Sequence, residues 1–317
     1  MPRTHLAETT SKVAGYLIGF AKTVTPKAAL PGMTRIFDRT TNSAERLTGW
    51  RKADDVLVPP LRIRLHIGPY FDPRAFKMAG EANVAAFRDL AGLGPDARFL
   101  DIGCGCGRIA IPLTKYFDGT AEYQGFDASP KPVEWCQKAI TPRFPNFKFR
   151  VTDTFSQRYN PSGHAIASKL SFPYEDDKFT FAFAGSVFTH MLPEEIPNFI
   201  AETSRVLRPG GVTLATFTLL NESRLQAVLE GRTMPRLIYR FGEFQVRTLA
   251  DPAHFIAQPE SWIRKLYAEA GLEIIEPIKY GTWAVPTPES LELERYHLGG
   301  SPSHEASQDA IIAVKRK

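Results

Sequence analysis

Residues 99–108, FLDIGCGCGR, read as a buried strand that runs into a glycine turn and then into a helix. Glycine is required where the backbone turns sharply and a ligand touches the main chain, because a Cβ atom would occupy the ligand's volume. Backbone N–H groups at the start of the helix then face a carboxylate or polar edge of the ligand. The stretch predicts a cofactor site at the end of the first strand of a parallel sheet.

The spacing of the glycines separates two kinds of nucleotide cofactor. Gly103, Gly105 and Gly107 depart from the nicotinamide fingerprint, which places its third glycine where this chain has Arg108. Asp101, two residues before the first glycine, would repel a pyrophosphate and attract an ammonium group. We therefore expect a cationic nucleoside that carries an amino-acid group.

Two further carboxylates follow expected strands. Asp127 lies twenty residues after Gly107, where an acidic side chain can accept hydrogen bonds from both ribose hydroxyls. Asp153 follows the third expected strand and can accept a hydrogen bond from an adenine amino group. A single acidic residue at a strand end is more often a helix cap or a turn former. With Asp101, three of them in succession favour a ligand site.

The cysteines Cys104, Cys106 and Cys136 have no spacing that suggests a disulfide framework, which fits a reducing compartment. Cys104 and Cys106 lack a third and fourth ligand nearby in the sequence, so we expect no metal site.

Short apolar strands alternate with helices from residue 98 onward, a pattern typical of a parallel sheet with crossover helices. Strands are expected at 98–102, 123–126, 148–151, 179–184, 212–217, 272–278 and 310–315, and helices at 108–116, 132–140, 194–206 and 259–270. We expect a turn at 208–211 and irregular structure over 219–258. The chain thus divides into a helical N-terminal arm or cap (1–97) and a domain (98–317) with insertions at about 219–258 and 280–306.

The arm is basic. Up to Ile67 the chain has eleven Lys and Arg against five Asp and Glu, a charge of +6, whereas the whole chain carries +5. Val13, Leu17, Phe20 and Val24 form a stripe at helical spacing. We expect this stripe to pack on the body of the protein, and the alternative is peripheral contact with an anionic membrane. The sequence shows neither the continuous apolar core of a secretory signal peptide nor a run of apolar residues long enough to span a membrane, so the expected location is cytoplasmic.

Five motifs resemble those of the class I S-adenosylmethionine-dependent methyltransferases. They are DIGCGCG (101–107), GFD (125–127), FPYEDDKF (172–179), SVFTH (186–190) and LRPGG (207–211). The resemblance implies that the glycine turn holds the methionine part of the cofactor, that Asp127 binds the ribose and that Asp153 marks the adenine pocket. It also implies a doubly wound, mostly parallel seven-stranded α/β sheet whose last strand, 310–315, is antiparallel.

Methyl transfer from a sulfonium is an in-line displacement, so no metal is needed and positioning supplies much of the acceleration. A base is needed only when the acceptor must lose a proton. His190 and Glu222 are the candidates for that role. The alternative for His190, which we favour, is a structural hydrogen-bond donor near the amino-acid end of the cofactor.

Other residues are candidates for binding. Arg64 can reach the cofactor's carboxylate or an anionic substrate, or it is a surface arginine of the arm. Tyr70, Arg236 and Tyr239 are candidate substrate residues, the last two on the long segment 219–258 that we expect to close over the acceptor.

We expect an enzyme that methylates a hydroxyl or amine of a small molecule, lipid or sugar. One alternative, a nucleic-acid or protein methyltransferase, rests on the basic arm, but that arm lacks the interleaved aromatic and basic pattern of a strand-binding groove. Another is a protein that binds S-adenosylmethionine without chemistry.

Overall fold

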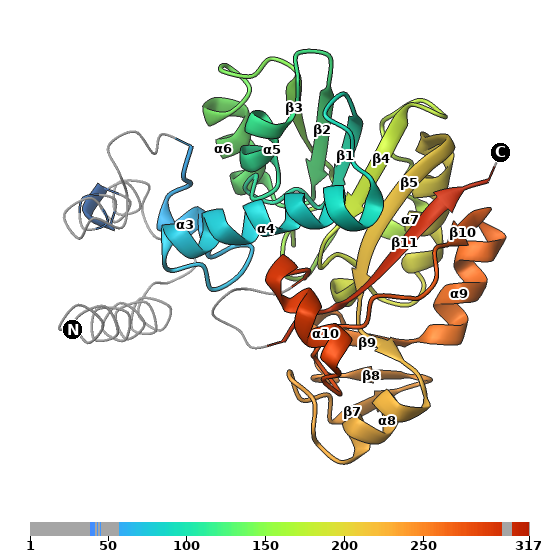
Figure 1. Ribbon diagram of the computed structural model, residues 1–317. Coiled ribbons are helices and arrows are strands. Elements are labelled where there is room, and N and C mark those ends of the chain that lie inside the picture. Colours follow the sequence, from blue (N-terminus) through green and yellow to red (C-terminus); the bar gives the residue numbers. More distant parts are fainter. Residues whose placement is uncertain (1–38, 42, 44, 46–56, 300–305, 317) are drawn as a thin grey trace.

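The computed structural model describes residues 39–41, 43, 45, 57–299 and 306–316 (Figure 1). The stripe of Val13, Leu17, Phe20 and Val24 lies outside the described residues, as does part of the expected 280–306 insertion. Within the described ranges, no helix is both long enough and apolar enough to cross a bilayer.

A seven-stranded sheet in the order β10-β11-β5-β4-β1-β2-β3 forms the centre of the molecule (Figure 1). Its strands are β1 (Arg98–Ile102), β2 (Glu122–Asp127), β3 (Phe147–Val151), β4 (Phe179–Ala184), β5 (Leu207–Phe217), β10 (Leu272–Ile274) and β11 (Asp309–Lys315). The first five run parallel, and β11 is antiparallel to both of its neighbours, β5 and β10. The predicted fold class, including the antiparallel last strand, is confirmed.

Helices cover both faces of this sheet because successive strand residues point to opposite sides. In β1, Phe99 faces a core shared with α4 (Pro73–Ala91), α5 (Ala110–Tyr116) and α6 (Pro130–Ala139), and Leu100 faces one shared with α7 (Ile196–Val206) and α9 (Glu260–Glu269). The same alternation recurs in β4, where Phe181 and Phe183 face the first core and Ala182 faces the second. Both faces are therefore closed to water.

Helix α4 begins and ends where its sequence predicts a cap. The Asp72 side chain accepts a hydrogen bond from the Arg74 N–H, and Gly92 ends the helix with a φ of 66°. Its buried face places Phe87 against Phe183, with ring centroids 4.5 Å apart. Helix α4, which lies within the expected arm or cap (1–97), thus packs on the central sheet.

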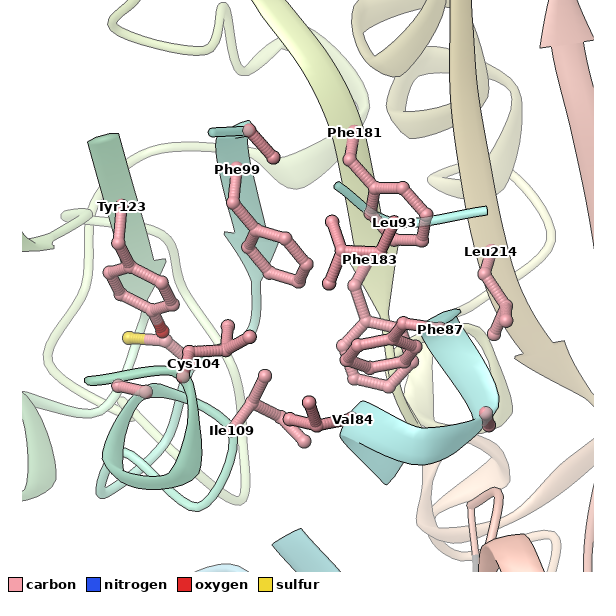
Figure 2. Packing of buried hydrophobic residues seen from close by; sticks show 14 of the residues in the cluster. Val84, Phe87, Leu93, Phe99, Cys104, Ile109, Tyr123, Phe181, Phe183 and Leu214 are labelled. Atoms are coloured by element: carbon pink, nitrogen blue, oxygen red, sulfur yellow. The ribbon is translucent and has the colours of Figure 1, made fainter. Parts of the chain in front are cut away.

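A row of stacked aromatic rings crosses four strands on that face of the sheet. Figure 2 labels Phe181, Phe99 and Tyr123 of this row. Phe181, Phe99, Tyr123 and Phe147 are register partners on β4, β1, β2 and β3. Their successive centroids lie 5.3, 5.8 and 5.0 Å apart, with the planes within 15° of parallel. Each such pair adds about 0.5–1.5 kcal/mol beyond burial, so the row holds the four strands in register.

The expectation of irregular structure over 219–258 is wrong. The segment forms a four-stranded sheet, β6-β9-β8-β7, and a helix. The elements are β6 (Leu219–Leu220), α8 (Glu222–Leu229), β7 (Tyr239–Phe241), β8 (Phe244–Val246) and β9 (Ile256–Pro259). These strands have two to four residues each, too few for a period-2 pattern to stand out. Their core includes Leu237, Ala257 and the distant Trp283, which the local sequence does not reveal.

Two other segments also differ from expectation. Residues 208–211 do not separate α7 from the next strand, because β5 already begins at Leu207, which pairs with Phe179 before a shift in register. Gly210, with a φ of 75°, lies in this irregular part of the strand. The 280–306 insertion includes α10 (Pro288–Leu293), and its Tyr296 is buried in the core beside α4.

A buried carboxylate joins the last strand to both insertions. Asp309, at the start of β11, accepts hydrogen bonds from the Leu219 N–H (2.7 Å), the Gly281 N–H (2.8 Å) and the Trp283 Nε1–H (2.8 Å). The buried Arg224 of α8 forms an ion pair with it at 3.1 Å. Burial raises the pKa of Asp309 to about 6, and the Arg224 charge opposes this rise.

We predict that Arg224→Met lowers the free energy of unfolding by about 3–5 kcal/mol at pH 8, because it leaves a buried carboxylate without its cation. The raised pKa of Asp309 rises further in the variant, so the loss shrinks as the pH falls through that value and the group becomes neutral. Urea unfolding at about pH 5.5 and pH 8 measures both effects.

The control is Arg232→Met, which breaks the exposed ion pair with Glu230 and should cost less than about 1 kcal/mol. An Arg224→Met loss that is equally small, or that does not change with pH, contradicts the role assigned to the buried pair.

Candidate active site

A cavity of about 680 Å³ lies at the carboxyl ends of β1, β2, β3 and β4. Ligands gather at this edge of parallel sheets because the loops that follow the strands meet there. The glycine turn, the segments after those strands, residues 66–70 and residues 251–253 line it, together with Trp283 and Gln308.

The glycine turn requires its three glycines for conformational reasons. Gly103, Gly105 and Gly107 have φ values of 76°, 51° and 77°, which side-chain-bearing residues rarely adopt. A Cβ atom at Gly103 would also lie 2.6 Å from Val187, and one at Gly105 would lie 2.5 Å from Ile67. Gly103 and Gly105 line the cavity, whereas Gly107 does not. Gly107 is therefore needed for the backbone conformation of the turn and not for contact with a ligand.

Asp127, the last residue of β2, is tied to that turn. One carboxylate oxygen accepts from the Gly105 N–H at 2.8 Å and the other from the Ser129 N–H at 2.7 Å. Burial raises its pKa, and the two backbone donors act in the opposite direction. Each oxygen retains acceptor capacity toward the cavity, as a pair of ribose hydroxyls requires.

Asp101 lies in the wall of the cavity with its side chain almost fully buried. The Tyr123 hydroxyl, at the end of the ring row, donates to it at 2.5 Å. Burial raises the pKa of Asp101 to about 7, while Tyr123 and the nearby Arg108 charge lower it. Arg108 also lines the cavity. In the sequence analysis Arg108 served only as evidence against a dinucleotide site, and its position beside Asp101 was not predicted.

Arg64 does not reach the cavity. Its guanidinium is fully buried and donates to the carbonyl oxygens of Tyr70 (3.0 Å), Pro59 (2.6 Å) and Phe71 (3.0 Å), and it forms an ion pair with Glu45. These partners use up its donors, which corrects the expectation of a cofactor contact or a surface residue. Arg64 instead holds the loop that brings Tyr70 into the wall of the cavity.

Asp153 does not line the cavity, contrary to the expectation of an adenine contact. Its exposed carboxylate lies 3.1 Å from Nδ1 of His164. The flanking Thr152 and Thr154 line the cavity instead, because side chains alternate along the extended segment that follows β3. The Oγ1 atom of Thr154 is buried and has no hydrogen-bond partner in the described part of the chain.

His190 lines the cavity in a short turn after β4. Its Nδ1 lies 3.3 Å from the Ala253 carbonyl, which can only accept, so Nδ1 carries the proton and Nε2 keeps a lone pair. Burial lowers the pKa of His190 to about 4, so the ring is neutral at pH 7. The rings of Tyr159 and Phe255 meet it edge-on, 5.9 and 6.0 Å away.

The other predicted site residues fall into two groups. Tyr70 is buried in the cavity wall, where its ring packs edge-on against Phe76. Glu222, Arg236 and Tyr239 are exposed and do not line the cavity, which corrects their assignment to catalysis and substrate binding. Their segment reaches the cavity through other residues: Met234, Pro235, Arg247, Asp251, Pro252, Ala253 and Phe255.

Gln308, which the sequence analysis missed, presents an oriented amide to the cavity. The Ser186 N–H donates to the Thr216 hydroxyl (2.8 Å), which donates to Oε1 of Gln308 (2.7 Å). The side-chain hydrogen bonds of Gln308 in the described part of the chain are both made by Oε1, from Ser186 and Thr216, and the side chain lines the cavity. The only sequence signal was a polar residue directly before a buried strand.

No group of three or more His, Cys, Asp or Glu side chains within the described ranges is arranged to hold a metal ion. Independence from metal stays a prediction.

The comparisons with solved structures give low similarity scores. A methyltransferase of Methanosarcina mazei is 22% identical, with a TM-score of 0.45, over 71% of this chain and 94% of that chain. A 1,6-didemethyltoxoflavin-N1-methyltransferase of Burkholderia thailandensis, with bound S-adenosylhomocysteine, is 15% identical, with a TM-score of 0.45, over 93% of this chain and 94% of that chain. Such scores carry no argument about substrate.

The comparisons of sequence are more specific. An uncharacterised protein of Haemophilus influenzae is 30% identical over 139 residues, which are 44% of this chain and 49% of that protein. The match thus spans about half the length of this curated relative. Residues 99–211 match the family model of a methyltransferase domain. With the glycine turn and the strand order, this match identifies residues 99–211 as a methyltransferase domain with the class I fold.

Proposed function

We propose that the protein transfers a methyl group from S-adenosylmethionine to a hydroxyl or amine of a small molecule, lipid or sugar. The observation that carries the proposal is a single cavity that joins a cofactor half, built from the glycine turn and Asp127, to a second half with its own polar groups. A volume of about 680 Å³ is typical of small-molecule sites and suits a nucleoside plus the reacting end of an acceptor.

The cofactor half matches a zwitterionic amino acid joined to a nucleoside. Asp101 and Arg108 bring opposite charges to one part of the wall, as an ammonium and a carboxylate require. Asp127 suits the ribose, and the unpartnered hydroxyl of Thr154 suits a polar edge of the base. The residues present therefore fit S-adenosylmethionine.

When bound, S-adenosylmethionine supplies a methyl group already activated on a sulfonium. The chain's own residues have to hold the two reactants in line and exclude water, and ideal positioning of this kind is worth about 7–11 kcal/mol. The close approach of Gly103 to Val187 brings the segment after β4 against the methionine end of the site. Ser186, His190 and, through Thr216, Gln308 belong to this neighbourhood.

His190 and Gln308 offer complementary hydrogen-bonding groups to an acceptor. The lone pair on Nε2 of His190 can accept from a hydroxyl or amine, while the Nε2–H groups of Gln308 donate. With its pKa lowered to about 4, His190 is a weak base at pH 7. We therefore assign it to orienting the acceptor's lone pair toward the methyl group, rather than to full removal of a proton.

We predict that calorimetry detects binding of S-adenosylhomocysteine but not of nicotinamide dinucleotides. Gly105→Val should abolish it through the positive φ and the clash with Ile67, and Asp127→Ala should weaken it at least about tenfold by removing two acceptors. The matched control is Gly119→Val, because a Cβ at Gly119 meets nothing within 4 Å. Full affinity in both site variants would reject the cofactor assignment.

The cofactor's affinity should also depend on pH. Asp101 must be ionised to bind an ammonium group, and its pKa is raised to about 7, so affinity falls as the pH drops through 7. Between about pH 7.5 and pH 6, the ionised fraction and hence the affinity should fall about eightfold. Asp101→Asn should bind weakly and show a flat profile, and a wild-type profile that is equally flat would contradict this role.

The activity itself is tested by incubating the protein with methyl-labelled S-adenosylmethionine and cell extract, followed by mass spectrometry of the labelled products. Gln308→Met should lower the transfer rate at limiting extract by at least about tenfold, with S-adenosylhomocysteine affinity unchanged within about threefold. Gln245→Met, outside the cavity, is the matched control. Cofactor binding without any labelled product would favour a non-catalytic binding protein.

A further inference from the structure

Large apolar side chains are concentrated on the surface of one insertion. Of the thirteen exposed large hydrophobic residues within the described ranges, seven lie between residues 225 and 249. They are Leu225, Leu229, Met234, Ile238, Tyr239, Phe241 and Leu249. Monomeric soluble proteins seldom gather so many in one place unless the surface binds something.

The local structure explains why these side chains point outward. Leu225 and Leu229 are four residues apart on α8, so they share a face, and the intervening Ala227 and Val228 pack into the small core. Tyr239 and Phe241 belong to β7, the terminal strand of the small sheet. The insertion forms one end of the molecule (Figure 1), so nothing in the described fold packs over these side chains.

Arginines are interleaved with the apolar residues. Arg236, Arg240 and Arg247 are exposed, and Glu243 is the only acidic residue between positions 231 and 249. The fourth arginine of this range, Arg232, is paired with Glu230. The sequence MPRLIYRF, residues 234–241, thus combines aliphatic, aromatic and cationic side chains. This mixture is typical of a surface that enters the headgroup region of a bilayer.

The apolar surface is continuous with the cavity. Met234 is 55% exposed and also lines the cavity. Arg247, which follows β8, is likewise both exposed and part of the cavity lining. A two-fold interface with a second copy of the chain would place two copies of this cationic surface against each other. Anionic headgroups would instead neutralise them, so the charges favour a lipid surface.

We propose that the exposed side chains of residues 225–249, the docking surface, bind a bilayer that carries anionic headgroups. The apolar side chains enter the interfacial layer while Arg236, Arg240 and Arg247 contact phosphates. In this orientation the part of the cavity wall formed by Met234 faces the bilayer. The docking surface is separate from the basic N-terminal arm and does not depend on the methyl transfer proposed above.

The test is co-sedimentation of the full-length protein with vesicles of phosphatidylcholine alone or with about a quarter phosphatidylglycerol. The wild type should bind the anionic vesicles at least about tenfold more tightly, and salt should weaken that binding. The double variants Leu229→Ser with Ile238→Ser, and Arg236→Gln with Arg240→Gln, should each lose at least about tenfold in partition coefficient. Unchanged S-adenosylhomocysteine affinity reports that the variants remain folded.

The matched control is Met78→Ser with Leu291→Ser, which removes side chains of similar exposure, 57% and 53%, from elsewhere on the surface. It should bind vesicles like the wild type. Because every variant retains the arm, a selective loss belongs to the docking surface. Vesicle binding that is absent in the wild type, insensitive to anionic lipid, or equal in wild type and both docking variants overturns the proposal. So does a dimer that only the docking variants lose, in the absence of vesicle binding.

Discussion

The hydrogen bond from the Tyr123 hydroxyl to Asp101 joins the core of this protein to its cavity. A buried carboxylate is costly unless donors satisfy it, so Asp101 depends on Tyr123 being held in place. Tyr123 in turn stacks between Phe99 and Phe147, its register partners on β1 and β3. The packing that sets the strand order therefore also sets the charge and the geometry at the start of the glycine turn.

Asp309 performs a comparable task at the start of the last strand. It satisfies donors from β6, from the segment after β10 and from α8, so a single carboxylate fixes both insertions to the last strand. The preceding residue, Gln308, is held in place next to Asp309, and its side-chain amide lines the cavity. This part of the cavity wall is thus assembled by contacts between residues that are far apart in the chain.

The two halves of the cavity differ in how they are built, and this bears on specificity. The cofactor half comes from the ends of β1 and β2, which a family of enzymes can share without sharing a substrate. The rest of the cavity wall takes Met234, Arg247 and Phe255 from the insertion and Gln308 from the position directly before the last strand. The same insertion carries the exposed apolar side chains of the proposed docking surface, so under both proposals one structural unit would determine the acceptor's chemistry and the place where the protein meets it.

The amino-acid sequence by itself determined the sheet, the glycine turn and the roles suggested for Asp101 and Asp127, because strand periodicity, positive-φ glycines and spacing are local properties. Only the tertiary structure decided which side chains reach the cavity. Asp153 lies outside the cavity although its neighbours Thr152 and Thr154 line it, and the guanidinium of Arg64 is hydrogen-bonded to buried carbonyls. Gln308 is oriented by Thr216, ninety-two residues away. These outcomes depend on long-range packing, which no spacing along the chain encodes.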